Sequence, residues 1–209
     1  MIKNPLQQFG QVPIQKGTLM SCFPDLAAPE KKIHALEKNG ELIRLKRGLY
    51  VVNELVSGKP IDSCLCANHL YGPSYFSLQW ALRFYGLIPE RVFMMTSVTT
   101  KRTRSFDTPI GSFSYMQVPK IYFPIGVRME ESNGCCSLMA TPEKALCDTI
   151  LSDNYVPDQS IVRLEEYLEE DIRFDTDALK DFNTSIIEEC VKTGRKTTIL
   201  KNLIKIIRQ

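Results

Sequence analysis

Basic side chains are the residues of this 209-residue chain whose types and spacing indicate chemistry most directly. Over residues 26–39, Ile33 and Leu36 recur at helical spacing and predict an amphipathic helix with a buried stripe. The outward face or its flank carries cations and one small residue: Lys31, Lys32, His34, Ala35 and Lys38. Such a face can approach phosphates or guanine edges in a DNA groove, and the simpler alternative is an ordinary solvated helix face.

A basic hairpin follows this helix. Two β-rich runs within Glu41–Val52 flank a Lys-Arg-Gly tip, where Gly48 is available for positive φ. Arg44, Lys46 and Arg47 lie in or beside the tip with no acid among them, so the tip can follow a phosphate backbone or enter a minor groove. Helix, helix and basic hairpin within about 50 residues is the order of a winged helix-turn-helix.

Two further basic segments are candidates for phosphate contact. Lys101-Arg102-Thr103-Arg104 places Arg102 and Arg104 on one face if the segment is extended, and the alternative is a charged edge strand. Residues 192–209 carry six basic side chains and no acid, beside an apolar helical face, whereas residues 163–189 are acidic. The simplest reading of 192–209 is a terminal helix docked on the domain, with a nucleic-acid contact as the alternative.

Enzyme and metal sites find little support. The chain has two histidines, His34 and His69, and Cys64, Cys66 and His69 lack the four-ligand spacing of structural zinc. Asp25 and Glu30 resemble a nuclease carboxylate pattern, but they fall on the helix beside the hairpin and not on a sheet. No phosphate-binding loop, dinucleotide fingerprint or Ser/His/Asp arrangement is visible. We therefore expect no catalytic residue, no metal and no cofactor.

Composition places the chain among ordinary globular proteins. It is 44% hydrophobic and 24% charged, with a net charge of +2, so overall charge says nothing about nucleic acid. The seven cysteines include no pair with CxxC spacing, which favours reduced thiols. Neither a signal peptide nor a run of about 18 apolar residues is present, so we expect a cytoplasmic protein with no membrane segment.

The coarse element pattern predicts an α+β protein with two domains. Residues 1–56 are expected to form the winged helix-turn-helix, with Asp25 as a helix N-cap and Pro29 in the first turn. Residues 57–209 are expected to form a domain with a mostly antiparallel sheet and a helical C-terminal third. The predicted elements of that domain are helices at 61–71 and 74–85, strands at 92–98, 113–118, 121–128 and 135–139, and helices at 142–152, 158–170, 176–182, 184–193 and 196–208. The aromatic block Tyr75–Tyr85 is interpreted as core.

Three motifs in this order resemble a known family. They are KKIHALEKNGELIRLKRGLYVV (31–52), GPSYFSLQWALRFYGLIPERVFMMTSVTTKRTRSF (72–106) and MATPEKALCDTI (139–150). Across roughly residues 15–155 the chain is similar to the AbiEi antitoxins of bacterial abortive-infection, type IV toxin–antitoxin systems. The resemblance implies a winged helix that binds inverted repeats in its own promoter. It also implies a C-terminal domain that counters a nucleotidyltransferase-type toxin encoded beside it, with no direct contact required.

The sequence thus predicts a sequence-specific DNA-binding repressor of its own operon that acts as a type IV antitoxin. The residues expected at duplex DNA are Lys31, Lys32, His34, Lys38, Arg44, Lys46, Arg47, Lys101, Arg102 and Arg104. The alternative is a phosphodiester hydrolase that uses the winged helix as a targeting module. Three or four carboxylates converging in a pocket would favour the hydrolase, and a basic face from helix 26–39 across the hairpin would favour the repressor.

Overall fold

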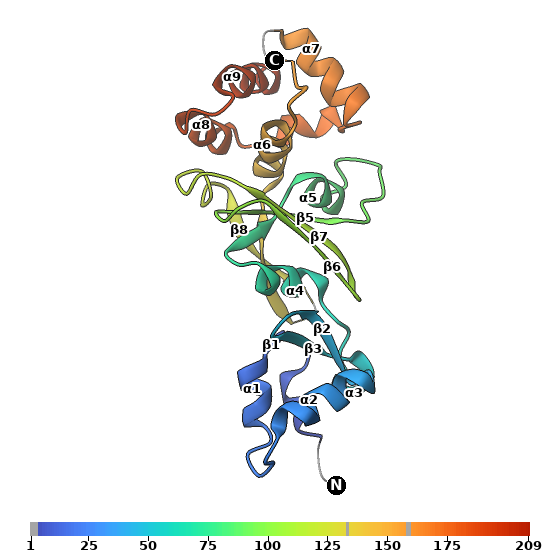
Figure 1. Ribbon diagram of the computed structural model, residues 1–209. Helices are drawn as coiled ribbons and strands as arrows, with labels where there is room; N and C mark the ends of the chain where they lie inside the picture. The colour runs from blue at the N-terminus through green and yellow to red at the C-terminus, as the bar shows by residue number, and fades with distance from the viewer. Residues whose placement is uncertain (1–3, 133, 158–159) are drawn as a thin grey trace.

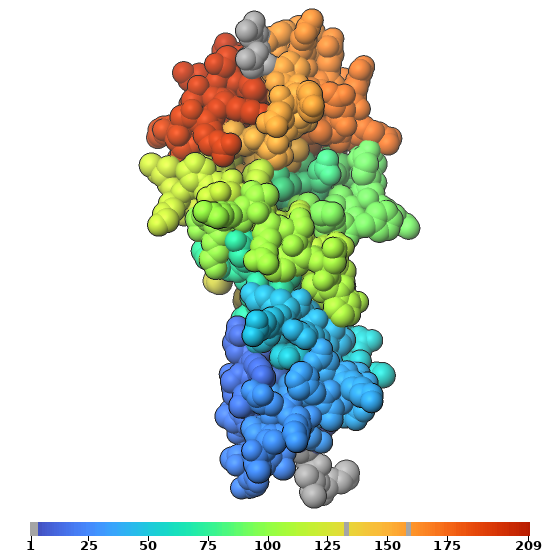
Figure 2. Space-filling view, in the orientation of Figure 1, coloured from blue at the N-terminus to red at the C-terminus, as the bar shows by residue number. Residues whose placement is uncertain are grey.

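The computed structural model describes residues 4–132, 134–157 and 160–209 and has an elongated shape (Figure 1). The N-terminal residues form one end, a six-stranded sheet lies in the middle, and the helices of the last third form the other end. In the space-filling view of Figure 2, the blue N-terminal lobe is narrower than the rest of the molecule. The fold is a mixture of helices and sheets, as the sequence predicts.

The N-terminal lobe consists of short helices around a three-stranded antiparallel sheet with strand order β1-β3-β2. Its elements are a 3₁₀ turn at Pro5–Phe9 (η1), β1 at Ile14–Gln15, α1 at Lys16–Ser21, α2 at Pro29–Lys38, β2 at Leu42–Lys46 and β3 at Leu49–Val52. The predicted hairpin is confirmed, and Gly48 occupies the turn with φ 81°.

Helix α2 begins later than the sequence predicts. Its N-cap is Ala28, which makes no side-chain cap hydrogen bond, so the prediction of Asp25 as N-cap is wrong. Pro29 stands in the first turn, as expected. A proline disfavours the helical conformation in the residue before it, so Ala28 is not helical and the helix cannot extend back towards Asp25.

The hairpin β2–β3 belongs to two hydrophobic cores. Leu42, Tyr50 and Val52 pack with the buried face of α2 in the N-terminal lobe. The opposite side contributes Leu45, Leu49 and Val51 to the large core of the rest of the chain. Because strand side chains alternate between faces, one hairpin can join two layers of structure. The hairpin is therefore an internal layer between the N-terminal lobe and the rest of the chain, which we call the second lobe (Figure 1).

The segment after the hairpin differs from the predicted pair of helices. It forms α3 at Glu54–Ser57, α4 at Ser63–Leu70, strand β4 at Ser74–Phe76 and α5 at Leu78–Phe84. The predicted helix 74–85 is thus wrong over its first residues. Ser74, Tyr75 and Phe76 are buried on both faces of a central strand, where an aromatic run is as suitable as in a helix.

The larger sheet has strand order β6-β7-β5-β4-β9-β8. The remaining strands are β5 at Met95–Thr99, β6 at Arg104–Thr108, β7 at Gly111–Gln117, β8 at Val127–Ser132 and β9 at Cys135–Ala140. Pairs β4–β9 and β5–β7 are parallel and the other neighbours are antiparallel, so this sheet is mixed, where a mostly antiparallel one was predicted. The predicted strand 121–128 is a series of turns up to Gly126, because hydrogen bonds such as Tyr122 N–H to Pro119 O close the chain locally.

The last third is helical. It comprises α6 at Pro142–Ser152, α7 at Ile161–Glu166, a π-helical turn at Tyr167–Asp171 (η2), a 3₁₀ turn at Thr176–Asp181 (η3), α8 at Thr184–Lys192 and α9 at Thr197–Ile207. Thr141 caps α6 by accepting from the Lys144 N–H, as its sequence predicts. The first residues of the predicted helix 158–170 lie outside the described residues.

One ion pair is completely buried where α6 meets the sheet. Lys144 Nζ lies 3.4 Å from Asp148 Oδ1, and both side chains are 0% exposed. The carboxylate also accepts hydrogen bonds from the hydroxyls of Tyr75 (3.0 Å), Ser77 (2.5 Å) and Tyr122 (2.7 Å). A buried charge is tolerated when it is paired and its lone pairs are used, so this network ties β4 to α6.

Candidate nucleic-acid interface

The outer face of α2 carries exposed cations, as the sequence predicts. Ile33 and Leu36 are buried, at 1% and 4% exposure, and turn the opposite side of the helix to solvent. Lys31, Lys32, His34, Ala35 and Lys38 are all exposed on it. The helix thus presents positive charge around a small residue, which lets another molecule approach its backbone.

A hollow of about 590 Å³ lies between α2 and the hairpin. It is lined by Lys16, His34, Arg44, Arg47, Gly48 and Tyr50. Lys16 was not among the residues chosen from the sequence. It reaches the hollow because β1 pairs with β3, and the Lys16 N–H then donates to the Gly48 carbonyl at the hairpin turn. No local sequence pattern predicts the position of Lys16 at the hollow, because the strand pairing joins residues more than thirty positions apart.

Two acids neutralise part of the charge around the hollow. Lys16 Nζ lies 2.8 Å from Glu30 Oε1, and this contact lowers the pKa of the Glu30 carboxyl. Glu37 lies 3.8 Å from His34 Nδ1 and 3.9 Å from the Arg44 guanidinium. Within the described residues, Lys31, Lys32, Lys38 and Arg47 form no ion pair. These four cations remain available to an anion from outside.

Lys46 points to the other side of the hairpin. Its ammonium donates to the Leu70 carbonyl at the end of α4. Burial lowers the pKa of Lys46, and the nearby charges of Lys101 and Arg104 lower it further. Lys46 therefore joins Leu45, Leu49 and Val51 in holding the hairpin to the second lobe, and it lies beside the second predicted basic segment.

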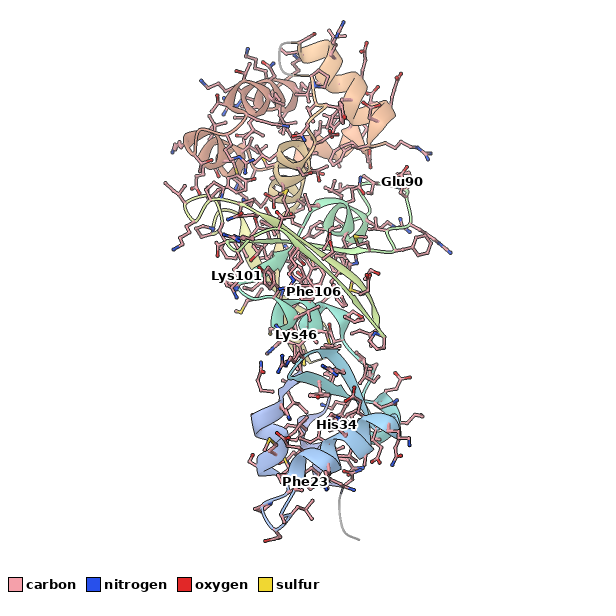
Figure 3. The ribbon with its side chains drawn as sticks, viewed as in Figure 1. Phe23, His34, Lys46, Glu90, Lys101 and Phe106 are labelled. Atoms are coloured by element: carbon pink, nitrogen blue, oxygen red, sulfur yellow. The ribbon has the colours of Figure 1, made fainter. Side chains whose placement is uncertain are left out.

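The second basic segment begins in the turn before β6. Lys101 donates to the Gly72 carbonyl and lies 5.2 Å from the centroid of the Tyr71 ring. The Arg104 guanidinium lies 4.8 Å from the centroid of the Phe106 ring. Arg102 is exposed, and its carbonyl accepts from the Tyr71 hydroxyl. Figure 3 shows His34, Lys46 and Lys101 following one another along the molecule from α2 to the sheet.

The structure does not bring the basic C-terminal segment to this surface. Helix α9 lies at the opposite end of the long axis from α2 (Figure 1). Ile199, Leu200 and Leu203 are buried in the large core, so α9 is a docked terminal helix. Lys196 donates to the carbonyls of Ile150 and Asp153, which assigns it a structural role.

The cysteine-rich helix α4 offers no ligand set for a metal. Burial, and then the charge of Asp62, raises the pKa of the Cys64 and Cys66 thiols to about 12. Across the described part of the chain, no group of three or more His, Cys, Asp or Glu side chains is placed to hold a metal ion.

No model of a known protein family and no curated protein matches the chain. None of the helices in the described ranges is both long and apolar enough to span a lipid bilayer.

Proposed function

We propose that the protein binds duplex DNA through α2 and the hollow beside the hairpin. The observation that carries the proposal is the set of exposed cations there without ion-pair partners among the described residues: Lys31, Lys32, Lys38 and Arg47. Cations spaced along a surface can contact the successive phosphates of a DNA backbone, and the major groove is wide enough to admit an α-helix such as α2.

The element order of the N-terminal lobe supports a winged helix-turn-helix at residues 1–56. The order helix, strand, helix, helix, strand, strand and the sheet order β1-β3-β2 fit that motif, with α2 as the recognition helix. The turn at Arg47-Gly48 is short, so the wing contributes Arg47 and Arg44 beside α2. Lys101, Arg102 and Arg104 lie beyond the hairpin, near Lys46 and the end of α4, and we propose them as a second, separate phosphate contact.

The three sequence motifs support a proposal for the cellular role of the protein. By their resemblance to AbiEi antitoxins, we propose that the protein is a cytoplasmic repressor of its own operon. It would bind inverted repeats in that promoter and counter a nucleotidyltransferase-type toxin encoded beside it, without needing to touch the toxin. We assign it no enzymatic activity and no cofactor, and no observation favours the hydrolase alternative.

The salt dependence of affinity for an operator fragment tests the DNA interface. Each phosphate contact contributes a slope of about −0.9 to the dependence of log affinity on log salt concentration. Lys31→Ala with Lys38→Ala should therefore weaken binding and flatten the slope by about two. Lys201→Ala with Lys205→Ala is the matched control, because both residues are exposed on the distant α9. Equal effects in the two double variants would contradict an interface at α2.

The genetic role has its own test. A promoter reporter should be repressed by the native chain and released by the α2 double variant. If the neighbouring open reading frame encodes the toxin, expressing that frame alone should inhibit growth. Co-expressing the native chain should then restore growth. Repression without rescue would retain the DNA-binding proposal and reject the antitoxin role.

A further inference from the structure

A second hollow, of about 240 Å³, lies in the helical part of the molecule, remote from α2. It opens between the start of α5, the end of α6 and the π-helical turn η2. Its lining includes Leu78, Thr96, Thr149, Ser152, Asp153 and Tyr167. Nothing in the proposed DNA interface uses these groups.

The hydroxyl hydrogens around this hollow are already engaged within the protein. Thr96 donates to the Ser77 carbonyl (2.8 Å), Thr149 to the Ala145 carbonyl (2.9 Å) and Ser152 to the Thr149 carbonyl (2.7 Å). The Tyr167 hydroxyl donates to Asp153 Oδ2 at 3.0 Å. A hydroxyl group has one hydrogen and two lone pairs, so what these groups can still offer is acceptor capacity.

Asp153 adds a negative charge that forms no ion pair within the described residues. Its carboxylate accepts from the Tyr155 N–H (2.8 Å) and the Tyr167 hydroxyl. The Lys196 ammonium feels the charge of this carboxylate but donates to the backbone carbonyls of Asp153 and Ile150, so it leaves the carboxylate oxygens without an ammonium donor. The C-terminal end of α6, where carbonyls accumulate partial negative charge, lies at the same place.

Two apolar side chains and one amide complete the lining of the hollow. The apolar lining residues are Leu78 and Ile172, and Ile172 is 8% exposed. About 240 Å³ corresponds to roughly eight water molecules, which is the size of a short aliphatic chain with one polar end. Gln79 is the lining side chain that can still donate.

We propose that this hollow binds an alkylammonium group, with the ammonium at Asp153 and the methylenes against Leu78 and Ile172. An ammonium has three donors and no acceptor, which matches the acceptors that the hollow presents. The same chemistry occurs in a free aliphatic diamine and in the lysine side chain of another protein. The proposal is independent of DNA binding.

Isothermal titration calorimetry provides the readout, because the ring of Trp80, the single tryptophan of the chain, packs against Phe76 and Phe84 and does not line the hollow. The full-length protein is titrated with 1,4-diaminobutane, with a lysine flanked by neutral blocking groups, and with 1,4-butanediol as an uncharged match. We expect a saturable heat of binding with an amine and none with the diol. Tighter binding of the diamine would identify a free aliphatic amine as the ligand. Tighter binding of the blocked lysine would identify a lysine side chain of another protein.

Asp153→Asn should weaken amine binding about tenfold or more, because a charge-assisted hydrogen bond is lost. Asp181→Asn is the control, since Asp181 is exposed and does not line the hollow. Ser152→Lys, which supplies its own alkylammonium from an exposed position, should abolish amine binding even if Asp153→Asn does not fold. The proposal is overturned if neither amine binds, if the diol binds equally, or if amine affinity is unchanged in a folded variant.

Discussion

Lys46 and Arg47 are adjacent in the chain, yet their side chains belong to different parts of the molecule. Lys46 donates to a carbonyl of α4, whereas Arg47 is exposed and lines the hollow beside α2. In the sequence both are equivalent cations of one basic tip. Which of them can meet DNA depends on the side of the hairpin that the second lobe covers.

The two residues should therefore respond differently to substitution. Arg47→Ala should weaken operator binding and reduce the salt slope by about one, with an unchanged melting temperature. Lys46→Ala should reduce the free energy of unfolding by about 1 kcal/mol, because the Leu70 carbonyl loses its charged donor. Paired fluorescence-anisotropy and thermal-unfolding measurements check both. A stability loss confined to Arg47→Ala would reverse the assignment.

The buried pair Lys144–Asp148 permits a second prediction at this scale. Asp148→Asn leaves the Lys144 ammonium buried, with 0% exposure, and without a counter-charge. The free energy of unfolding should fall by about 3–5 kcal/mol in urea titrations at neutral pH. Asp177→Asn removes the partner of Lys180 in an exposed pair, and the unfolding midpoint should stay unchanged. Similar midpoints for the two variants would mean that the buried network contributes little.

At the scale of elements, the turn that leads into β8 depends on a close approach. Gly126 has φ 59°, and a Cβ there would lie 2.8 Å from Lys144 Cβ and 2.8 Å from Ile186 Cγ2. Its carbonyl accepts from the Thr141 N–H at the start of α6, so the turn, the helix and α8 meet at this glycine.

Gly126→Ala should destabilise the protein by more than the backbone conformation alone requires. Left-handed backbone costs a non-glycine residue about 1–2 kcal/mol, and the overlap with two packed side chains adds to this cost. Gly40→Ala provides the comparison, since Gly40 has φ 75° and nothing within 4 Å of an added Cβ. Urea unfolding of both variants separates the two effects. Equal losses in the free energy of unfolding would show that Lys144 and Ile186 can move away from the added methyl group at little cost.

At the scale of the whole molecule, the hairpin shared by two cores makes the lobes interdependent. Leu45, Leu49 and Val51 are buried against the second lobe, and each contributes roughly 1.5–3 kcal/mol by burial. A fragment ending near residue 56 would expose these side chains. Binding studies therefore call for the full chain.

Leu49→Ala should lower stability throughout the molecule. A buried leucine replaced by alanine costs about 2–5 kcal/mol, and the transition followed by Trp80 fluorescence in the second lobe should shift as much as that followed by far-UV circular dichroism. Leu55→Ala is the control, because Leu55 is 90% exposed. If only the dichroism signal moved, the lobes would unfold independently.

The sequence by itself determined the elements whose signals are local. The Ile33–Leu36 stripe of α2, the hairpin turning at Gly48 and the capped start of α6 at Thr141-Pro142 all follow from spacing, caps and turn residues within a few positions. The exposed cations of α2 follow from the same periodicity.

Only the tertiary structure decided which strand is central and which cations are already engaged. Tyr75-Phe76 became a strand because β5 and β9 flank it, and Lys16 joined the hollow through β1–β3 pairing. Lys46 and Lys101 donate hydrogen bonds to carbonyls around the end of α4, and α9 lies at the end of the molecule opposite α2. These outcomes depend on pairings between distant segments, and local side-chain periodicity carries no information about the partner of a strand or the neighbour of a charge.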